Sequence, residues 1–157
     1  MKPKSEAGGM KRSGILLLSA MLVSCSQPLT TEQIIISRIR SMEAQIEEGE
    51  RRRFMTNIAE DFRSQNGQMN RDQLRTFVVL QLTRYENLNA QLFPINVQQV
   101  NDQEAMASFN ALLTGGPGWF PEDGQLYRFE TFWKLEEEEW LLASAGWEPI
   151  RVGELVE

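Results

Sequence analysis

The spacing of apolar residues changes once along this chain, close to Leu88. Before that residue, apolar side chains recur every three or four positions, which is the period of an amphipathic helix. After it, apolar and polar residues alternate over several segments separated by turn-forming residues, a pattern typical of β-strands. Helices that precede a run of strands with short connections favour an α+β domain with an antiparallel sheet.

Three N-terminal helices are predicted. Thr30 and Gln33 are spaced as a capping box, and the apolar face that follows ends before Gly49. That face carries Ile35, Ile39, Met42 and Ile46. A second helix is predicted over residues 50–60, and a third begins after the cap-like Asn70 and ends near residue 87.

The second half of the chain predicts a sheet of about four strands. Their expected ranges are residues 91–100, 105–113, 125–135 and 138–147. The turn at residues 136–139 is entirely acidic and is interpreted as a solvated hairpin tip, because four adjacent carboxylates do not converge on one calcium ion. We therefore expect no metal site there.

Pairing the last two strands around this turn predicts which side chains share a face. Trp133 would lie opposite Leu142, and Thr131 would lie opposite Ser144. A one-residue slip or a β-bulge would exchange the two faces of the hairpin.

The N-terminal segment is typical of a secretory signal peptide. Lys11 and Arg12 precede an apolar run from Ile15 to Val23, which is about half the length needed to cross a membrane. The run ends in Leu22-Val23-Ser24-Cys25, which resembles the lipobox of bacterial lipoproteins. The resemblance implies cleavage before Cys25 and a lipid on its sulfur.

This resemblance also predicts the organisation and location of the chain. Residues 1–24 would be the signal peptide, 25–30 a tether, 31–150 the domain and 151–157 a C-terminal tail. In Gram-negative lipoproteins an aspartate after the cysteine usually retains the protein at the inner membrane, so Ser26 favours the outer membrane. The domain would then face the periplasm, and the lipid on Cys25 would hold it to the membrane.

Composition excludes several classes of chemistry. The chain has no histidine, and Cys25 is its only cysteine, so no Ser/His/Asp or Cys/His triad is available. Without the five charged residues of the leader, the chain has 12 basic and 21 acidic residues, a net charge of −9. Such an acidic chain has no electrostatic footprint for nucleic acid. We expect no cofactor.

The order of elements resembles the NTF2-like and SnoaL-like superfamily, whose cystatin-like cone is a curved sheet wrapped around helices. Three short segments carry the resemblance: residues 58–62 (IAEDF), 69–74 (MNRDQL), and the hairpin 132–135 (FWKL) with 139–142 (EWLL). The fold implies a pocket between sheet and helices. The candidate lining residues are Tyr85, Tyr127, Phe129, Thr131, Trp133, Leu142 and Ser144, with Trp119 and Phe120 as a loop over the mouth.

Three functions remain open from the sequence. A binder of a small amphipathic ligand or an envelope protein is favoured, and a purely structural envelope protein is an alternative. An isomerase or cyclase would need a pocket carboxylate, for which Asp61 and Glu130 are candidates beside the two tyrosines. The resemblance also implies dimerisation through the open sheet face, where Phe132 and Trp147 are expected to be exposed.

Overall fold

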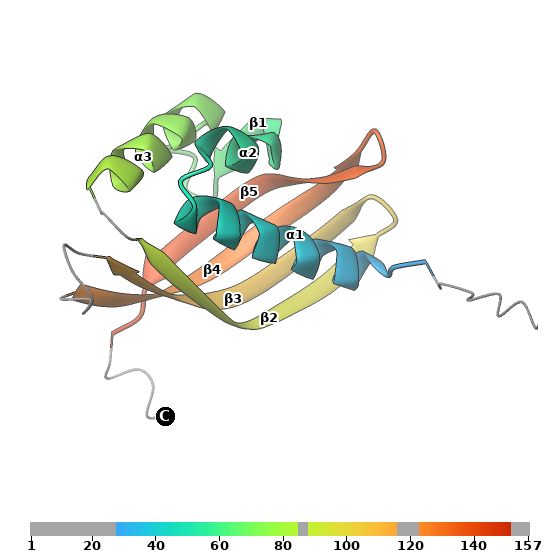
Figure 1. Cartoon of the computed structure of the whole chain (residues 1–157). Helices are drawn as coiled ribbons and strands as arrows, with labels where there is room; N and C mark the ends of the chain where they lie inside the picture. The colour runs from blue at the N-terminus through green and yellow to red at the C-terminus, as the bar shows by residue number, and fades with distance from the viewer. Residues whose placement is uncertain (1–27, 85–87, 116–122, 152–157) are drawn as a thin grey trace, which may run out of the picture.

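Three helices cover one face of a strongly curved five-stranded sheet (Figure 1). The structure is a computed structural model that describes residues 28–84, 88–115 and 123–151. The elements are α1 (Thr31–Glu47), α2 (Arg51–Thr56), β1 (Ile58–Ser64), α3 (Arg71–Arg84), β2 (Asn89–Asn101), β3 (Glu104–Gly115), β4 (Asp123–Glu136) and β5 (Glu139–Pro149). The α+β class is confirmed. No helix among the described residues is both long and apolar enough to span a membrane.

The strand order in the sheet is β1-β5-β4-β3-β2. Strands β2 to β5 form the predicted antiparallel succession, each paired with its neighbour in the sequence. Strand β1 was not predicted, and it pairs with β5 in parallel. The sheet is therefore mixed, and one helix, α3, lies between β1 and the other strands in the sequence.

The predicted helix over residues 50–60 is wrong in its second half. Helix α2 ends at Thr56, and residues 58–64 are strand β1. The buried Asn57 side chain donates hydrogen bonds to the carbonyl oxygens of Arg53 and Phe54, at 3.0 and 3.2 Å. These bonds satisfy carbonyls at the end of α2, so the chain can leave the helix there.

Two predicted helix starts are confirmed by their hydrogen bonds. The Thr30 hydroxyl accepts the Gln33 N–H at 3.2 Å, and the Gln33 side chain accepts the Thr30 N–H at 3.0 Å. Asn70 and Gln73 form the same reciprocal pair at the start of α3. The predicted break at Gly49 is also present, with a φ of 70° that favours glycine.

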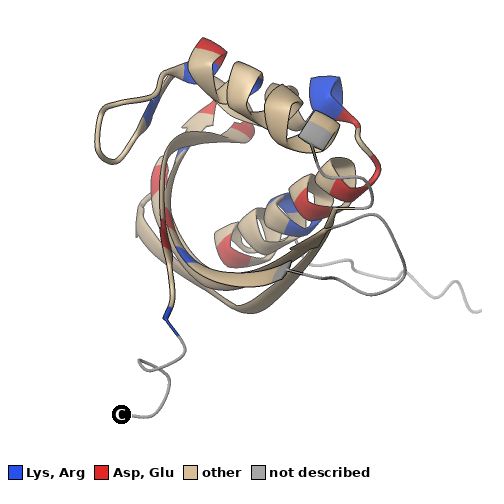
Figure 2. Cartoon of the chain, turned by 90° about the vertical axis from the view of Figure 1, so that its left-hand side faces the viewer, with Lys and Arg blue, Asp and Glu red and all other residues tan. Residues whose placement is uncertain are grey.

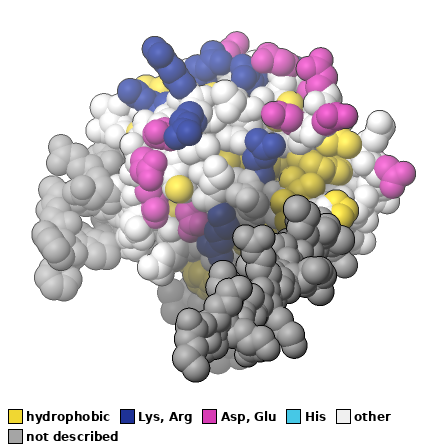
Figure 3. Space-filling view, turned by 45° about the vertical axis from the view of Figure 1, so that its right-hand side comes forward, with side chains coloured by type: hydrophobic (Ala, Val, Ile, Leu, Met, Phe, Trp, Pro, Cys, Tyr) yellow, Lys and Arg dark blue, Asp and Glu magenta, His cyan; other side chains and the backbone are white. Residues whose placement is uncertain are grey.

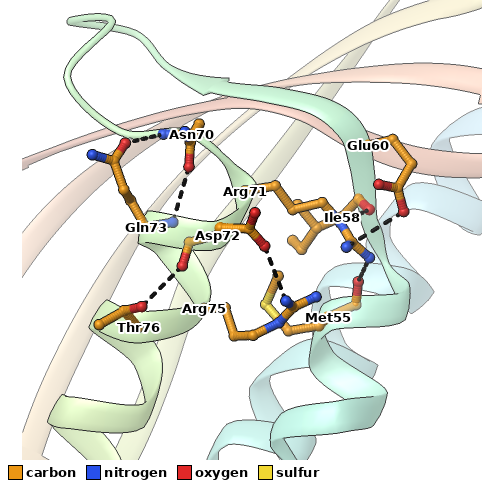
Figure 4. Close-up of polar contacts among 9 residues, drawn as sticks. All are labelled: Met55, Ile58, Glu60, Asn70, Arg71, Asp72, Gln73, Arg75 and Thr76. Carbon is orange, nitrogen blue, oxygen red and sulfur yellow. Dashed lines mark hydrogen bonds and ion pairs between the residues drawn. The ribbon is translucent and has the colours of Figure 1, made fainter.

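Arg71 joins α3 to the segment where α2 ends and β1 begins (Figure 4). Its guanidinium donates to the carbonyl oxygens of Ile58 and Met55, at 3.2 and 3.1 Å. It also lies 3.4 Å from a carboxylate oxygen of Glu60. The Arg71 side chain thus fixes α3 against the end of α2 and the start of β1.

Helix α1 covers part of the edge of β2. The Glu47 carboxylate accepts the Ala90 N–H at 2.9 Å, and Glu43 accepts the Leu92 N–H at 3.3 Å. Arg40 donates to the Leu92 carbonyl oxygen at 3.0 Å. These side chains satisfy backbone groups that an edge strand leaves unpaired, and they set how far α1 stands from the sheet.

Charged side chains of both signs are interspersed on the face shown in Figure 3. Several pairs are local helix contacts, such as Arg53 with Glu50 at 2.7 Å and Arg75 with Asp72 at 2.9 Å. Pairs this exposed contribute little to stability. These exposed ion pairs are typical of solvated helix surfaces.

Candidate functional site

A cavity of about 460 Å³ lies between the concave face of the sheet and helices α1 and α3. Figure 2 shows the curvature of the sheet that gives it this concave face. Most of its walls are apolar or aromatic side chains, which is the usual lining of a small-molecule site. The cavity is therefore the candidate functional site.

A row of aromatic rings crosses the wall of the cavity from β3 to α3. Phe109 and Phe129 stack with ring centroids 5.1 Å apart, and Phe129 and Trp147 follow at 6.3 Å. Trp147 in turn stacks on Phe77 of α3 at 6.0 Å. Aromatic pairs at these distances stabilise one another beyond their buried area, so the row forms a firm apolar wall.

The deep end of the cavity has no free polar group among its described side chains. Trp133 is only 1% exposed, and its indole N–H donates to the Thr131 hydroxyl at 2.9 Å. That hydroxyl donates to the Ala107 carbonyl oxygen at 2.9 Å. Because both groups already have partners, this end offers a ligand only apolar contact.

The opposite end is polar. Thr114, Gln125 and Tyr127 line the cavity where β3 ends and β4 begins, and Gln81 lines it from the last turn of α3. The pairing of Ala111 with Tyr127 and of Leu113 with Gln125 places these groups at one end of the sheet. They are amide and hydroxyl groups, which can both donate and accept hydrogen bonds.

Glu43 is the one residue with a charged side chain among the described lining residues. Both of its carboxylate oxygens have partners: one accepts the Leu92 N–H at 3.3 Å, and the other lies 2.9 Å from an Arg40 nitrogen. The bond from the Leu92 N–H joins α1 to β2, and the pair with Arg40 lies within α1. The carboxylate is therefore held in a structural role.

The structure places five predicted pocket residues on the cavity wall. They are Tyr127, Phe129, Thr131, Trp133 and Leu142. Four others, namely Tyr85, Trp119, Phe120 and the lipidation candidate Cys25, lie outside the described residues. Contact of Tyr85, Trp119 and Phe120 with a ligand stays a prediction, and so does the lipidation of Cys25.

The prediction for Ser144 is wrong, because the hairpin contains a β-bulge. Trp133 pairs with Leu142 as expected, but Thr131 pairs with Ala145, and Ser144 pairs with Phe132 on the other face. The register shift between Phe132 and Trp133 inserts an extra residue on β5. Ala145, in place of Ser144, lines the cavity.

The same bulge moves Trp147 to the inner face. It was expected on the outer face of the sheet, but it lines the cavity and stacks on Phe129. The sequence had also not singled out Phe77, Phe109 and Gln81 as lining residues. Phe77 lies three residues after Leu74 on the helix, and Phe109 lies two residues after Ala107 on the strand, so the spacing of apolar residues did contain the signal for them.

The two carboxylates nominated for catalysis do not line the cavity. Glu130 is exposed on β4. Asp61 on β1 accepts a hydrogen bond from Lys134 at 2.6 Å, and this bond lowers the pKa of Asp61 and raises the pKa of Lys134. Asp61 is thus a surface ion-pair partner. No cluster of three or more metal-binding side chains occurs within residues 28–84, 88–115 and 123–151.

A second, more polar groove of about 490 Å³ lies beside the turn at residues 64–69. There the Gln65 side chain lies so close over Gly146 that a Cβ at that glycine would clash with the Gln65 amide oxygen. Arg128 and Glu148 in this groove pair with each other at 3.2 Å. Glu130, the other charged residue of its lining, is exposed on β4. The groove is thus more polar and more charged than the cavity, and it is a weaker candidate for a small amphipathic ligand.

No family model matches the chain, and no curated protein is significantly similar to it in sequence. Solved structures are similar in fold. An uncharacterised protein with a cystatin-like fold from Caulobacter vibrioides is 13% identical, with a TM-score of 0.66 over 78% of this chain and 91% of that one. A candidate dehydratase from the NTF2-like family of Streptomyces avermitilis is 14% identical, with a TM-score of 0.65 over 76% and 97%.

Bd1075 of Bdellovibrio bacteriovorus is 11% identical, with a TM-score of 0.65 over 75% of this chain, which matches only 40% of that longer chain. Identities this low establish the fold and no activity. The chain has the NTF2-like, or cystatin-like, cone fold that the sequence predicted.

Proposed function

We propose that this chain is a lipid-anchored protein of the bacterial envelope whose NTF2-like domain binds a small amphipathic ligand in its cavity. The observation that carries the proposal is the cavity itself, about 460 Å³ in volume and walled by the row Phe109, Phe129, Trp147 and Phe77. Its size and apolar lining are those of small-molecule sites.

Catalysis by a pocket carboxylate has less support. Asp61 and Glu130 do not line the cavity, and the Glu43 carboxylate is engaged by Arg40 and the Leu92 amide. A general base needs to reach a substrate proton. Ligand binding requires only the apolar wall and the polar end of the cavity.

A fluorescence titration tests ligand binding. 1-N-phenylnaphthylamine, an uncharged apolar probe, should bind saturably to the full chain carrying Cys25→Ser, which prevents lipidation. Ala111 is 1% exposed and lines the cavity, so Ala111→Phe should fill the space and weaken probe binding by about tenfold or more. Ser108→Phe adds the same ring on the outer face of β3 and should leave binding unchanged.

Equal binding by the two phenylalanine variants would contradict a site in the cavity. Circular dichroism of both variants distinguishes loss of the site from loss of the fold.

Mass spectrometry tests the anchor. The proposed lipid anchor rests on the sequence Leu22-Val23-Ser24-Cys25. The mature protein from bacterial membranes should therefore begin at Cys25 and carry a diacylglycerol on its sulfur. Cys25→Ser should abolish the modification and release the chain from the outer-membrane fraction. An unmodified Cys25 in the membrane-bound protein would contradict the anchor.

A further inference from the structure

We propose that the cavity selects an uncharged amphiphile, with one hydrogen-bonding headgroup and an apolar tail, over a charged amphiphile of the same length. This inference rests on the ligand-binding function proposed above and adds the charge and orientation of the ligand. It follows from the distribution of polar and charged groups along the cavity.

The polar end of the cavity provides partners for an uncharged headgroup. Gln81 on α3 faces the same cavity as Thr114, Gln125 and Tyr127 on the sheet. Amides and hydroxyls both donate and accept hydrogen bonds. A hydroxyl headgroup, which donates and accepts, or an ester headgroup, which only accepts, can therefore find a partner at this end.

A charged headgroup has no counter-ion among the described lining residues. None of them is lysine or arginine, and the single carboxylate, that of Glu43, is held by Arg40 and the Leu92 N–H. Burying a carboxylate without a partner is costly, so an anionic ligand is disfavoured.

The orientation of the ligand follows from the absence of a free polar group among the described side chains at the deep end of the cavity. The Trp133 indole and the Thr131 hydroxyl satisfy each other and the Ala107 carbonyl oxygen. A headgroup placed there would find no free partner, whereas an alkyl or ring tail would contact Trp133 and Leu142. The tail therefore lies deep and the headgroup lies beside Gln125 and Tyr127.

The test compares three ligands with the same tail. Dodecanol, dodecanoic acid and dodecylamine, each below the concentration at which it aggregates, displace 1-N-phenylnaphthylamine from the full chain carrying Cys25→Ser. At pH 7.5 dodecanol should bind roughly tenfold or more tightly than either charged ligand. The affinity for dodecanoic acid should rise as the pH is lowered toward the ordinary carboxyl pKa, because the acid then enters the cavity uncharged. The affinity for dodecanol should not change with pH.

A cation placed at the polar end should reverse the preference. Gln81→Lys keeps a long helix-forming side chain at a lining position and should raise the affinity for dodecanoic acid about tenfold relative to dodecanol. Leu80→Lys is the matched control: it adds the same charge to the same helix at a position 60% exposed, and it should not change the ratio.

Each outcome has one meaning. If the acid or the amine binds as tightly as dodecanol, or if Gln81→Lys and Leu80→Lys act alike, the charge selection is wrong while ligand binding stands. If the probe itself does not bind saturably, the proposed function fails and this inference fails with it.

Discussion

At the residue scale, Asn57 decides where α2 ends. It is 3% exposed, and its amide nitrogen donates to the Gln45 side chain at 2.9 Å and to the carbonyl oxygens of Arg53 and Phe54. Its side-chain oxygen accepts from Arg38 at 3.3 Å. Every polar atom of the side chain is therefore used, and the strand β1 can begin at the next residue.

Replacing Asn57 should destabilise the fold. Asn57→Ala leaves buried partners without hydrogen bonds, so we expect the free energy of unfolding to fall by about 2 kcal/mol. Urea denaturation measures the difference. Asn96→Ala, at an exposed position on β2, is the control and should stay within about 0.5 kcal/mol. Equal effects from the two variants would contradict the role assigned to Asn57.

The ion pair of Asp61 and Lys134 makes stability depend on pH. The hydrogen bond from Lys134 lowers the pKa of Asp61 in the folded state, so the pair stabilises the fold above the ordinary Asp pKa and the effect disappears as the pH falls through the folded pKa. Asp61 is 71% exposed, so the contribution is small. Asp61→Asn should lower the urea midpoint at pH 7 but not at pH 2. A difference that persists at pH 2 would contradict this linkage.

At the element scale, the hairpin between β4 and β5 carries backbone strain. Glu137 and Glu138 have φ values of 47° and 68°, a left-handed conformation that disfavours residues other than Gly, Asn and Asp. They are the two central residues of the turn, since Glu136 pairs with Glu139. This acidic turn was predicted from the sequence, but its strain was not.

Glycine at this turn should stabilise the protein. Glu138→Gly removes the penalty for positive φ, and we expect the free energy of unfolding to rise by about 1 kcal/mol. Glu138→Gln removes the same negative charge without changing the backbone preference, and it should give a smaller gain. Thermal denaturation of both variants separates the two causes. An equal gain would show that charge repulsion, and not the backbone, limits this turn.

The elements differ in how well the sequence predicted them. Helices α1 and α3 and strands β2 to β5 were expected, because caps and alternation mark them locally. Strand β1 was missed because Ile58 and Phe62 are four residues apart, a spacing that places side chains on one side of a helix and also of a strand. Only the parallel pairing with β5, distant in sequence, decides between the two.

The site was predicted less completely than the fold. The bulge on β5 falls in Leu142-Ala143-Ser144-Ala145, where small residues follow one another and alternation gives no sign of an inserted residue. Gln81 was not identified because its polar side chain interrupts the apolar pattern of α3, although it lies four residues after Phe77 and therefore on the same side of the helix. Tertiary contacts therefore determine which residues line the cavity.

At the scale of the whole molecule, the hydrogen bonds that hold the helices on the sheet differ from the contacts that the cavity offers a ligand. Helix α1 is fixed to the edge of β2 by Glu43 and Glu47, and α3 is fixed to β1 by Arg71. The aromatic row and the polar end lie between these supports. The fold can thus hold a cavity open with contacts that the ligand does not use.

A crystal structure of the chain grown with dodecanol tests the central claim most directly, since it shows both the cavity and its occupant. The account predicts density for one molecule, with its tail beside Trp133 and Trp147 and its hydroxyl within hydrogen-bond distance of Tyr127 or Gln125. A cavity filled by its own tryptophan and phenylalanine side chains, with no dodecanol inside, would contradict it.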